Sequence, residues 1–83
     1  MDIFELFDAK AAAFCMARGH KLHDHRQDET GRVLFVFLKT EGLRDTLHEF
    51  QKPGTQVEIQ QYNSHYRYLM DIIQQYKFQS RAS

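Results

Sequence analysis

Apolar and polar positions alternate along this chain in a way that predicts both strands and helices. The most apolar stretch is residues 33–38, six consecutive apolar side chains between Arg32 and Lys39. Four of the six are β-branched or aromatic, and the run is too short and too sharply bounded for a helix, so we predict a β-strand. Because side chains alternate along a strand, both faces of this one are apolar and need cover.

A turn and a more polar extended segment precede this strand. Residues 20–27 alternate around Leu22, which indicates a strand with one mostly solvated face. The turn that follows ends at Gly31, a residue that can adopt a positive φ without steric cost. We therefore predict a β-hairpin over about residues 20–39.

Two other segments are candidates for a further short strand. Residues 3–7 are mostly apolar, but their spacing fits neither the helical nor the strand period, so they open a helix or form a strand. In residues 55–59, Val57 and Ile59 alternate with polar side chains, as in a short strand. The sequence does not decide which of the two segments forms the further strand.

Capping residues predict the first two helices. Asp8 can accept a hydrogen bond from a free backbone N–H, and the alanine-rich segment after it stops before Gly19, which predicts a helix at about 8–18. Thr40 can cap a second helix at about 41–51. Its apolar residues recur at helical spacing, and it ends before a proline–glycine turn.

A third and longer helix is predicted at about 60–77. Six residues at steps of three and four form its apolar stripe: Ile59, Tyr62, Tyr66, Leu69, Ile73 and Tyr76. Asn63 is an alternative cap for this helix, and residues 78–83 are expected to be frayed. We expect Leu69 of this stripe to be buried in the core together with Phe35 of the central strand.

These elements predict an α+β fold in a single domain of residues 1–83, with a small antiparallel sheet packed by three helices. Helices on one face of the sheet leave Leu34, Val36 and Leu38 on the other face as an apolar patch. Patches of this kind usually mark interfaces, and a twofold dimer is the commonest way to close one. The competing account is that residues 3–7 fold across this face within one chain.

The composition narrows the class of protein. The 11 basic and 11 acidic side chains cancel, so the net charge gives no preference for a polyanion. The single cysteine, Cys15, excludes an internal disulfide and suits a reducing compartment. No apolar run approaches the roughly 20 residues that span a bilayer. The acidic N-terminal segment is also wrong for a secretory signal, so we expect a cytoplasmic protein without a membrane contact.

Two features of the sequence are candidates for a metal site or a reactive group. His23 and His25 face the same way on a strand and could share a metal ion, but no spacing here matches a zinc pattern. Polar side chains on an edge strand prevent edge-to-edge pairing, so we expect both histidines to be exposed and free of metal. Cys15 lies mid-helix among alanines, where a thiol behaves as a small apolar group. We expect no cofactor and no enzymatic activity.

Aromatic and basic residues offer a binding alternative. Tyr68 lies off the apolar stripe of the last helix beside Arg67, and Arg44 is on the polar side of the second helix. Together with hairpin residues such as Arg26 and Arg32, they could stack bases or bind phosphate. Acidic residues are interleaved with these cations, which is equally typical of a solvated mixed surface.

One longer pattern covers nearly the whole chain. It comprises Asp8 before the alanine-rich helix, Gly19-His20-Lys21-Leu22, Gly31-Arg32-Val33-Leu34-Phe35-Val36-Phe37, Leu43-Arg44, and Val57 before a helix with Tyr62, Arg67 and Leu69. This pattern resembles a family of small proteins from bacteriophages and bacterial genomes that is labelled only as a domain of unknown function. The resemblance implies a phage or mobile-element setting and carries over no activity or site residue. Met70 departs from the pattern, because a lysine is expected there.

The leading functional hypothesis is a small non-enzymatic binding or assembly protein of phage or mobile-element type that forms a homodimer. Its partners are a second copy of the chain and a protein, in the host cytoplasm if a phage encodes it. The alternative is an accessory nucleic-acid-binding protein that uses the aromatic and basic residues of the last helix and the hairpin.

Overall fold

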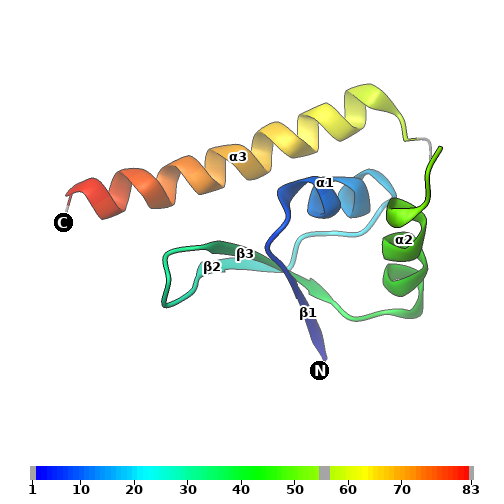
Figure 1. Ribbon diagram of the computed structural model, residues 1–83, viewed down its shortest axis with the longest axis horizontal. Helices are drawn as coiled ribbons and strands as arrows, with labels where there is room; N and C mark the ends of the chain where they lie inside the picture. Colours follow the sequence, from blue (N-terminus) through cyan, green and yellow to red (C-terminus); the bar gives the residue numbers. More distant parts are fainter. Residues whose placement is uncertain (1, 55–56, 83) are drawn as a thin grey trace.

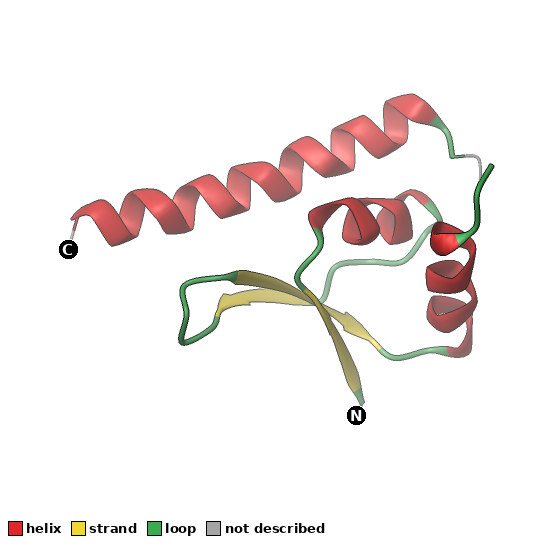
Figure 2. Ribbon diagram, in the orientation of Figure 1, coloured by secondary structure: helices red, strands yellow, loops and turns green. Residues whose placement is uncertain are grey.

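The computed structural model describes residues 2–54 and 57–82. It has the predicted α+β fold, with an antiparallel sheet and helices in the order shown in Figures 1 and 2. The elements are β1 (Ile3–Leu6), α1 (Ala9–Ala17), β2 (Asp24–Gln27), β3 (Val33–Leu38), α2 (Glu41–Gln51) and α3 (Ile59–Ala82).

The sheet has three strands in the order β1-β3-β2, with the apolar strand β3 in the centre. Both neighbours are antiparallel to β3, and the β1 register runs from Ile3 opposite Leu38 to Leu6 opposite Phe35. The candidate strand at 3–7 is therefore confirmed. In the other candidate, 55–59, the first two residues lie outside the described part of the chain, and the described remainder is not a strand but leads into α3.

The first hairpin strand is shorter than predicted, because only Asp24–Gln27 of the segment 20–27 pairs with β3. The side chain of His20 is drawn toward α2 instead, where its Nε2 lies 3.0 Å from the Thr46 hydroxyl. The backbone N–H of His23 still donates to the Val36 carbonyl at 2.8 Å. The hairpin prediction is thus confirmed, and its start moves from residue 20 to residue 24.

Local signals position α1 and α2. The Asp8 carboxylate accepts a hydrogen bond from the Lys10 N–H at 2.9 Å, and the Thr40 hydroxyl accepts one from the Leu43 N–H at 3.2 Å. Both predicted N-caps are confirmed. Gly19 has a φ of 98°, which allows the chain to leave α1 in a left-handed turn.

Helix α3 is longer than predicted. It begins at Ile59, where the Glu58 carboxylate accepts hydrogen bonds from the N–H groups of Gln60 and Gln61, and Asn63 lies inside it rather than at its start. It continues to Ala82, beyond its predicted end at about residue 77. No glycine or proline interrupts the sequence there, and its residues are compatible with a helix. None of the described helices is long and apolar enough to cross a membrane.

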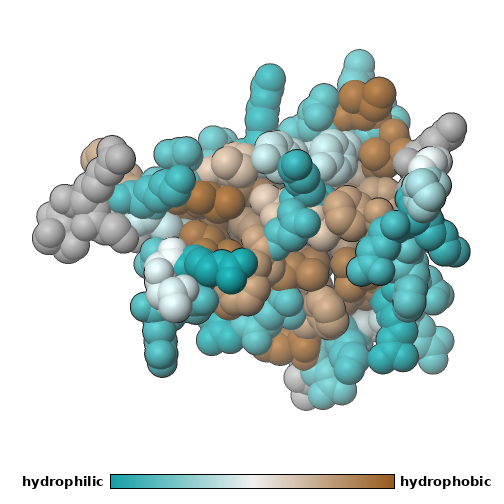
Figure 3. All heavy atoms as spheres, viewed as in Figure 1, coloured by the Kyte–Doolittle hydropathy of each residue, from teal (hydrophilic) through white to brown (hydrophobic). Residues whose placement is uncertain are grey.

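The core lies between the sheet and the helices. Phe35, Phe37, Leu43, Leu69 and Cys15 are the largest fully buried side chains, which confirms the prediction for Phe35 and Leu69. Figure 1 shows α1 and α3 on the same side of the sheet and α2 beyond the end of β3. In the same view, apolar surface runs through the middle of the molecule and hydrophilic side chains gather over α2 (Figure 3).

Candidate interaction surfaces

The structure places the two histidines of the candidate metal pair in different surroundings. His23 is exposed, but His25 is half-buried, because its Nδ1 lies 2.9 Å from the hydroxyl of Tyr76 on α3. The expectation that both are exposed is therefore wrong for His25. Within the described residues, no group of three or more histidine, cysteine or acidic side chains could hold a metal ion.

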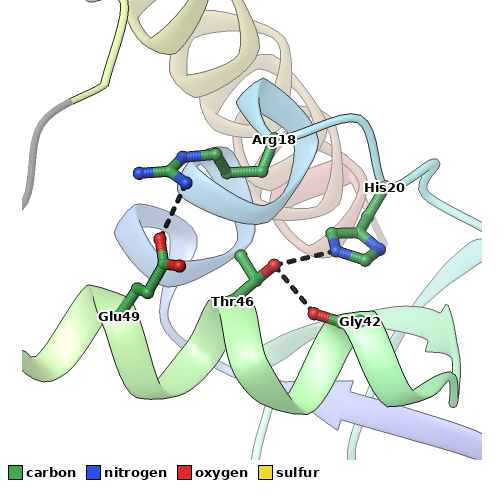
Figure 4. A network of polar contacts seen from close by, with 5 residues as sticks. All are labelled: Arg18, His20, Gly42, Thr46 and Glu49. Carbon is green, nitrogen blue, oxygen red and sulfur yellow. Dashed lines mark hydrogen bonds and ion pairs between the residues drawn. The ribbon is translucent and has the colours of Figure 1, made fainter.

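His20 takes part in a different network, between α1 and α2 (Figure 4). The Thr46 hydroxyl donates to the Gly42 carbonyl at 2.8 Å, so it accepts from the Nε2 of His20, which must carry the proton. Arg18 and Glu49 form an ion pair of 2.7 Å beside it. These contacts join the two helices, so His20 has a structural role.

Cys15 is fully buried in α1. Burial raises the pKa of its thiol to about 11, because the thiolate would lose its hydration there. A thiol that is buried and protonated at neutral pH packs as a small apolar side chain, which agrees with its placement among alanines.

Arg44 lines an open groove of about 800 Å³ between β1 and α2. Phe4 and Leu47 are apolar members of its lining, and Lys39 and Asp2 are charged ones. Among residues 2–54 and 57–78, neither Arg44 nor Lys39 forms an ion pair. The lining of the groove therefore combines apolar side chains with charges of both signs.

The structure separates Arg67 and Tyr68 from Arg44. Both lie on α3 and are exposed, Tyr68 by 52%, whereas the groove that Arg44 lines contains no residue of α3. The rings of Tyr62 and Tyr66 on the same helix are stacked, with centroids 6.2 Å apart, and pack against the core. Burial raises the pKa of the Tyr62 hydroxyl. Tyr68 is thus exposed, as predicted, and so is Phe78 further along the same helix.

The two hairpin arginines are engaged with β1 and its continuation. Arg26 donates from Nε to the Glu5 carboxylate at 3.0 Å and forms an ion pair with it through a second nitrogen, which raises the pKa of Arg26. The guanidinium carbon of Arg32 lies 4.2 Å from the centre of the Phe7 ring. These contacts run over the face of the sheet that is turned away from the helices.

This helix-free face carries three exposed apolar side chains: Ile3 (47%), Phe7 (41%) and Leu38 (38%). Ile3 and Leu38 are directly paired across β1 and β3, so they form one patch. Leu34 and Val36 between the two ends are only 5% and 4% exposed. The prediction of three exposed side chains along β3 is therefore wrong, because Glu5 and Arg26 on the flanking strands cover the middle of the face.

The two edges of the sheet differ. On β2, the outward N–H of His25 donates to the Asp24 carboxylate at 2.8 Å, and its carbonyl accepts from the Tyr76 hydroxyl at 3.3 Å. On β1, the outward groups of Ile3 and Glu5 make no hydrogen bond within residues 2–54 and 57–82. Sequence analysis missed this contrast, because β1 itself was ambiguous and the contact of His25 with Tyr76 spans 51 residues.

Comparison with known proteins gives one match. No curated protein and no solved structure matches the chain. The family model of a domain of unknown function, DUF5659, matches residues 1–76, which includes every strand, α1, α2 and most of α3. The chain therefore belongs to the DUF5659 family.

Proposed function

We propose that this protein is a non-enzymatic binding and assembly module that works as a homodimer joined through its sheet. The observation that carries the proposal is that helices cover only one face of the sheet, while the other has exposed apolar side chains at both ends. Such patches on small proteins usually mark contacts with other chains. A phage or mobile-element genome and the host cytoplasm are part of the same proposal.

The molecule is thin, which favours association with a second copy that either covers the sheet or extends it at its edge. Its shortest dimension is 19 Å, about one sheet and one helix layer. Two-layer domains of this size bury a modest fraction of their surface, and association with another copy is a common way to bury more.

The buried thiol supports a role other than catalysis. Cys15 has no access to solvent, and the histidine pair is divided between an exposed residue, His23, and a contact to α3, through His25. The groove beside Arg44 is open and mixed in charge, which suits a contact surface.

Light scattering between 1 and about 100 μM tests the homodimer. We expect a mass of twice the 9.9 kDa of the chain. Ile59→Lys and Phe78→Lys are matched controls, because these apolar residues of α3 are 70% and 74% exposed but lie away from the sheet. Both variants should leave the dimer intact. A monomer that persists to about 100 μM, or a dimer lost in either α3 variant, contradicts the proposal.

The alternative is an accessory nucleic-acid-binding protein, and the adjacent exposed Arg67 and Tyr68 favour it. A shift assay with single-stranded DNA at low and moderate salt tests this role, because binding driven by phosphate contacts weakens as salt rises. Loss of a salt-sensitive shift in Tyr68→Ala, but not in Tyr62→Phe, would support it. The absence of a shift at low salt would rule out the nucleic-acid-binding role.

A further inference from the structure

The free edge of β1 exposes hydrogen-bonding groups at two alternate residues. The N–H of Lys39 donates to the Asp2 carbonyl at 3.0 Å, which fixes residues 2, 4 and 6 as those whose backbone groups face β3. In an antiparallel pair the intervening residues point the other way. Ile3 and Glu5 therefore direct two N–H and two C=O groups away from the sheet.

The opposite edge is closed at His25, one of the two β2 residues whose backbone groups point away from β3; those of Gln27, the other one, make no hydrogen bond within the described residues. The N–H of Asp28 donates to the Arg32 carbonyl at 2.8 Å, so His25, three residues earlier, points away from β3. Its outward N–H and C=O are bonded to Asp24 and to Tyr76 of α3. Natural sheets usually protect their edges in such ways. In the part of the chain that the structure describes, β1 has no such contact at either of its outward residues, so it is the more open edge of the sheet.

We propose that the strand that occupies this edge is β1 of a second copy, antiparallel, with a twofold axis beside Phe4, so that two three-stranded sheets become one of six strands. This inference rests on the proposed homodimer and specifies how its copies join. Isologous contacts of this kind close after two subunits and leave no open edge at the interface.

The spacing of the outward groups selects the register. With Phe4 opposite Phe4 of the second copy, Ile3 lies opposite Glu5 and Glu5 opposite Ile3, so all four outward groups on each strand find partners. Centring the axis on Ile3 would use only one such pair within the strand. Centring it on Glu5 would place two carboxylates directly opposite each other, which is unfavourable. Only the Phe4 register satisfies both strands without opposing like charges.

The helix side of the edge has room for this arrangement. Phe4 is half-buried and lines the open groove between β1 and α2. In the proposed register the two Phe4 residues form a pair without hydrogen bonds between them, where cross-strand side chains approach closest. Aromatic pairs at such positions are favourable, and the groove receives the second ring.

The alternative of two helix-free faces packed against each other is disfavoured by the ion pair on that face. The Arg26 side chain is 60% exposed and that of Glu5 34%, so a dry contact would remove both charges from water. Desolvation of a salt bridge often outweighs its attraction. Edge pairing leaves this ion pair hydrated and brings the Ile3–Leu38 patches of both copies onto one continuous face.

Backbone chemistry tests the edge without changing a side chain. The bond between Phe14 and Cys15 allows the chain to be assembled from residues 1–14 and 15–83 at a natural cysteine. An N-methyl group on Glu5 then removes one outward donor from each copy. We expect this full-length variant to dimerise at least about tenfold more weakly than the unmodified ligated chain, because two hydrogen bonds are lost and the methyl groups separate the strands.

Leu38→Lys distinguishes edge pairing from packing of the two helix-free faces, because Leu38 is exposed on that face but lies on the central strand, away from the edge. It should change the dimer dissociation constant by less than about threefold. Thermal unfolding of each variant verifies that the fold is retained. Phe4→Cys gives a readout independent of synthesis: it should form an intermolecular disulfide on mild oxidation, and Leu38→Cys should not.

The outcomes distinguish this inference from the homodimer itself. A wild-type monomer at about 100 μM contradicts both. A wild-type dimer that the Glu5 N-methyl group leaves unchanged contradicts the edge alone, as does a dimer that Leu38→Lys dissociates. Folded Phe4→Cys that stays uncross-linked in the dimer also contradicts it. An edge that instead takes an extended peptide while the protein stays monomeric overturns the second copy as its occupant.

Discussion

Phe35 occupies the centre of the core because the alternation of β3 points it toward α1 and α3. It is fully buried, and Leu69 from the middle of α3 is buried in the same cluster. Both could be predicted from sequence, since each lies on an apolar face whose period is unambiguous. The burial of Leu34 and Val36 could not be predicted from sequence, because charged residues on two other strands cover these side chains.

Truncation of Phe35 should therefore be costly. We expect Phe35→Ala to lower the free energy of unfolding by about 3–5 kcal/mol, the usual range for an aromatic ring removed from a core. Urea unfolding at fixed protein concentration measures it. Phe78→Ala is the control, because Phe78 is 74% exposed, and should change the stability by about 0.5 kcal/mol or less. Equal effects of the two would contradict this account of the core.

Cys15 should report on unfolding. Its pKa is raised from 9.0 to about 11 in the folded protein, so the unfolded chain releases the thiol proton first as the pH rises. Stability should therefore fall as the pH increases from about 9 toward 11. Cys15→Ala should reduce this loss, and the part that remains is expected from the Tyr62 hydroxyl, whose pKa is also raised. At pH 8, a thiol reagent should label the native protein at least roughly 10³-fold more slowly than the urea-unfolded chain. Rapid native labelling would show that the thiol is accessible.

Among the elements, those with local start and stop signals were the ones that sequence predicted well. Asp8 and Thr40 lie within three residues of the N–H groups they accept from, so their roles are readable from neighbouring positions. The segment that became β1 has no such signal. Its conformation is set by pairing with β3 more than 28 residues away, a contact that no local pattern encodes. From the local sequence alone, residues 3–7 could therefore be predicted only as either a strand or the start of a helix.

The hairpin turn depends on one carboxylate. Asp28 accepts hydrogen bonds from the N–H groups of Thr30 and Arg32, both at 2.9 Å, and from the Thr30 hydroxyl at 2.7 Å. The bond with the Thr30 hydroxyl is the largest contribution that lowers the Asp28 pKa. A carboxylate with a lowered pKa stabilises the fold above its unfolded pKa of about 4, and this contribution is lost as the pH falls through the folded value.

We accordingly expect Asp28→Ala to lower the urea midpoint at pH 7 and to have a smaller effect below about pH 4. Glu29→Ala, at the neighbouring exposed acidic residue, is the control and should leave the midpoint at both pH values nearly unchanged. An Asp28→Ala effect that is the same at both pH values would show that the charge of the carboxylate does not stabilise the turn.

The contact between β2 and α3 can be tested by removing one hydroxyl. Tyr76→Phe leaves the ring against His25 but deletes the partner of the imidazole and of the carbonyl, so we expect a loss of about 0.5–1.5 kcal/mol in the free energy of unfolding. Tyr68→Phe removes an exposed hydroxyl from the same helix and should cost about 0.5 kcal/mol or less. Urea unfolding of the two variants measures the difference.

At the scale of the whole molecule, the sequence indicated an excess of apolar surface without locating it. Both competing accounts of the second face were partly wrong: Leu34 and Val36 are buried within one chain, and residues 3–6 pair at the edge instead of folding across the face. The number of apolar positions follows from the composition of the chain and from the periodicity of its strands and helices. Their placement depends on which strands are neighbours, and the strand order β1-β3-β2 is a property of the complete fold.

A ribosome adds Tyr76 only after all three strands have been made, because α3 follows them in the chain. During synthesis the β2 edge therefore stays open until the part of α3 that contains Tyr76 has been made, and chains growing side by side on one messenger RNA can pair through it. The last turns of α3 thus determine how long the nascent sheet can pair with the sheet of another chain. In cell-free translation, we expect chains that end at residue 75 to sediment as aggregates and chains that end at residue 77 to stay in the supernatant. Equal sedimentation of the two would show that Tyr76 does not protect the edge.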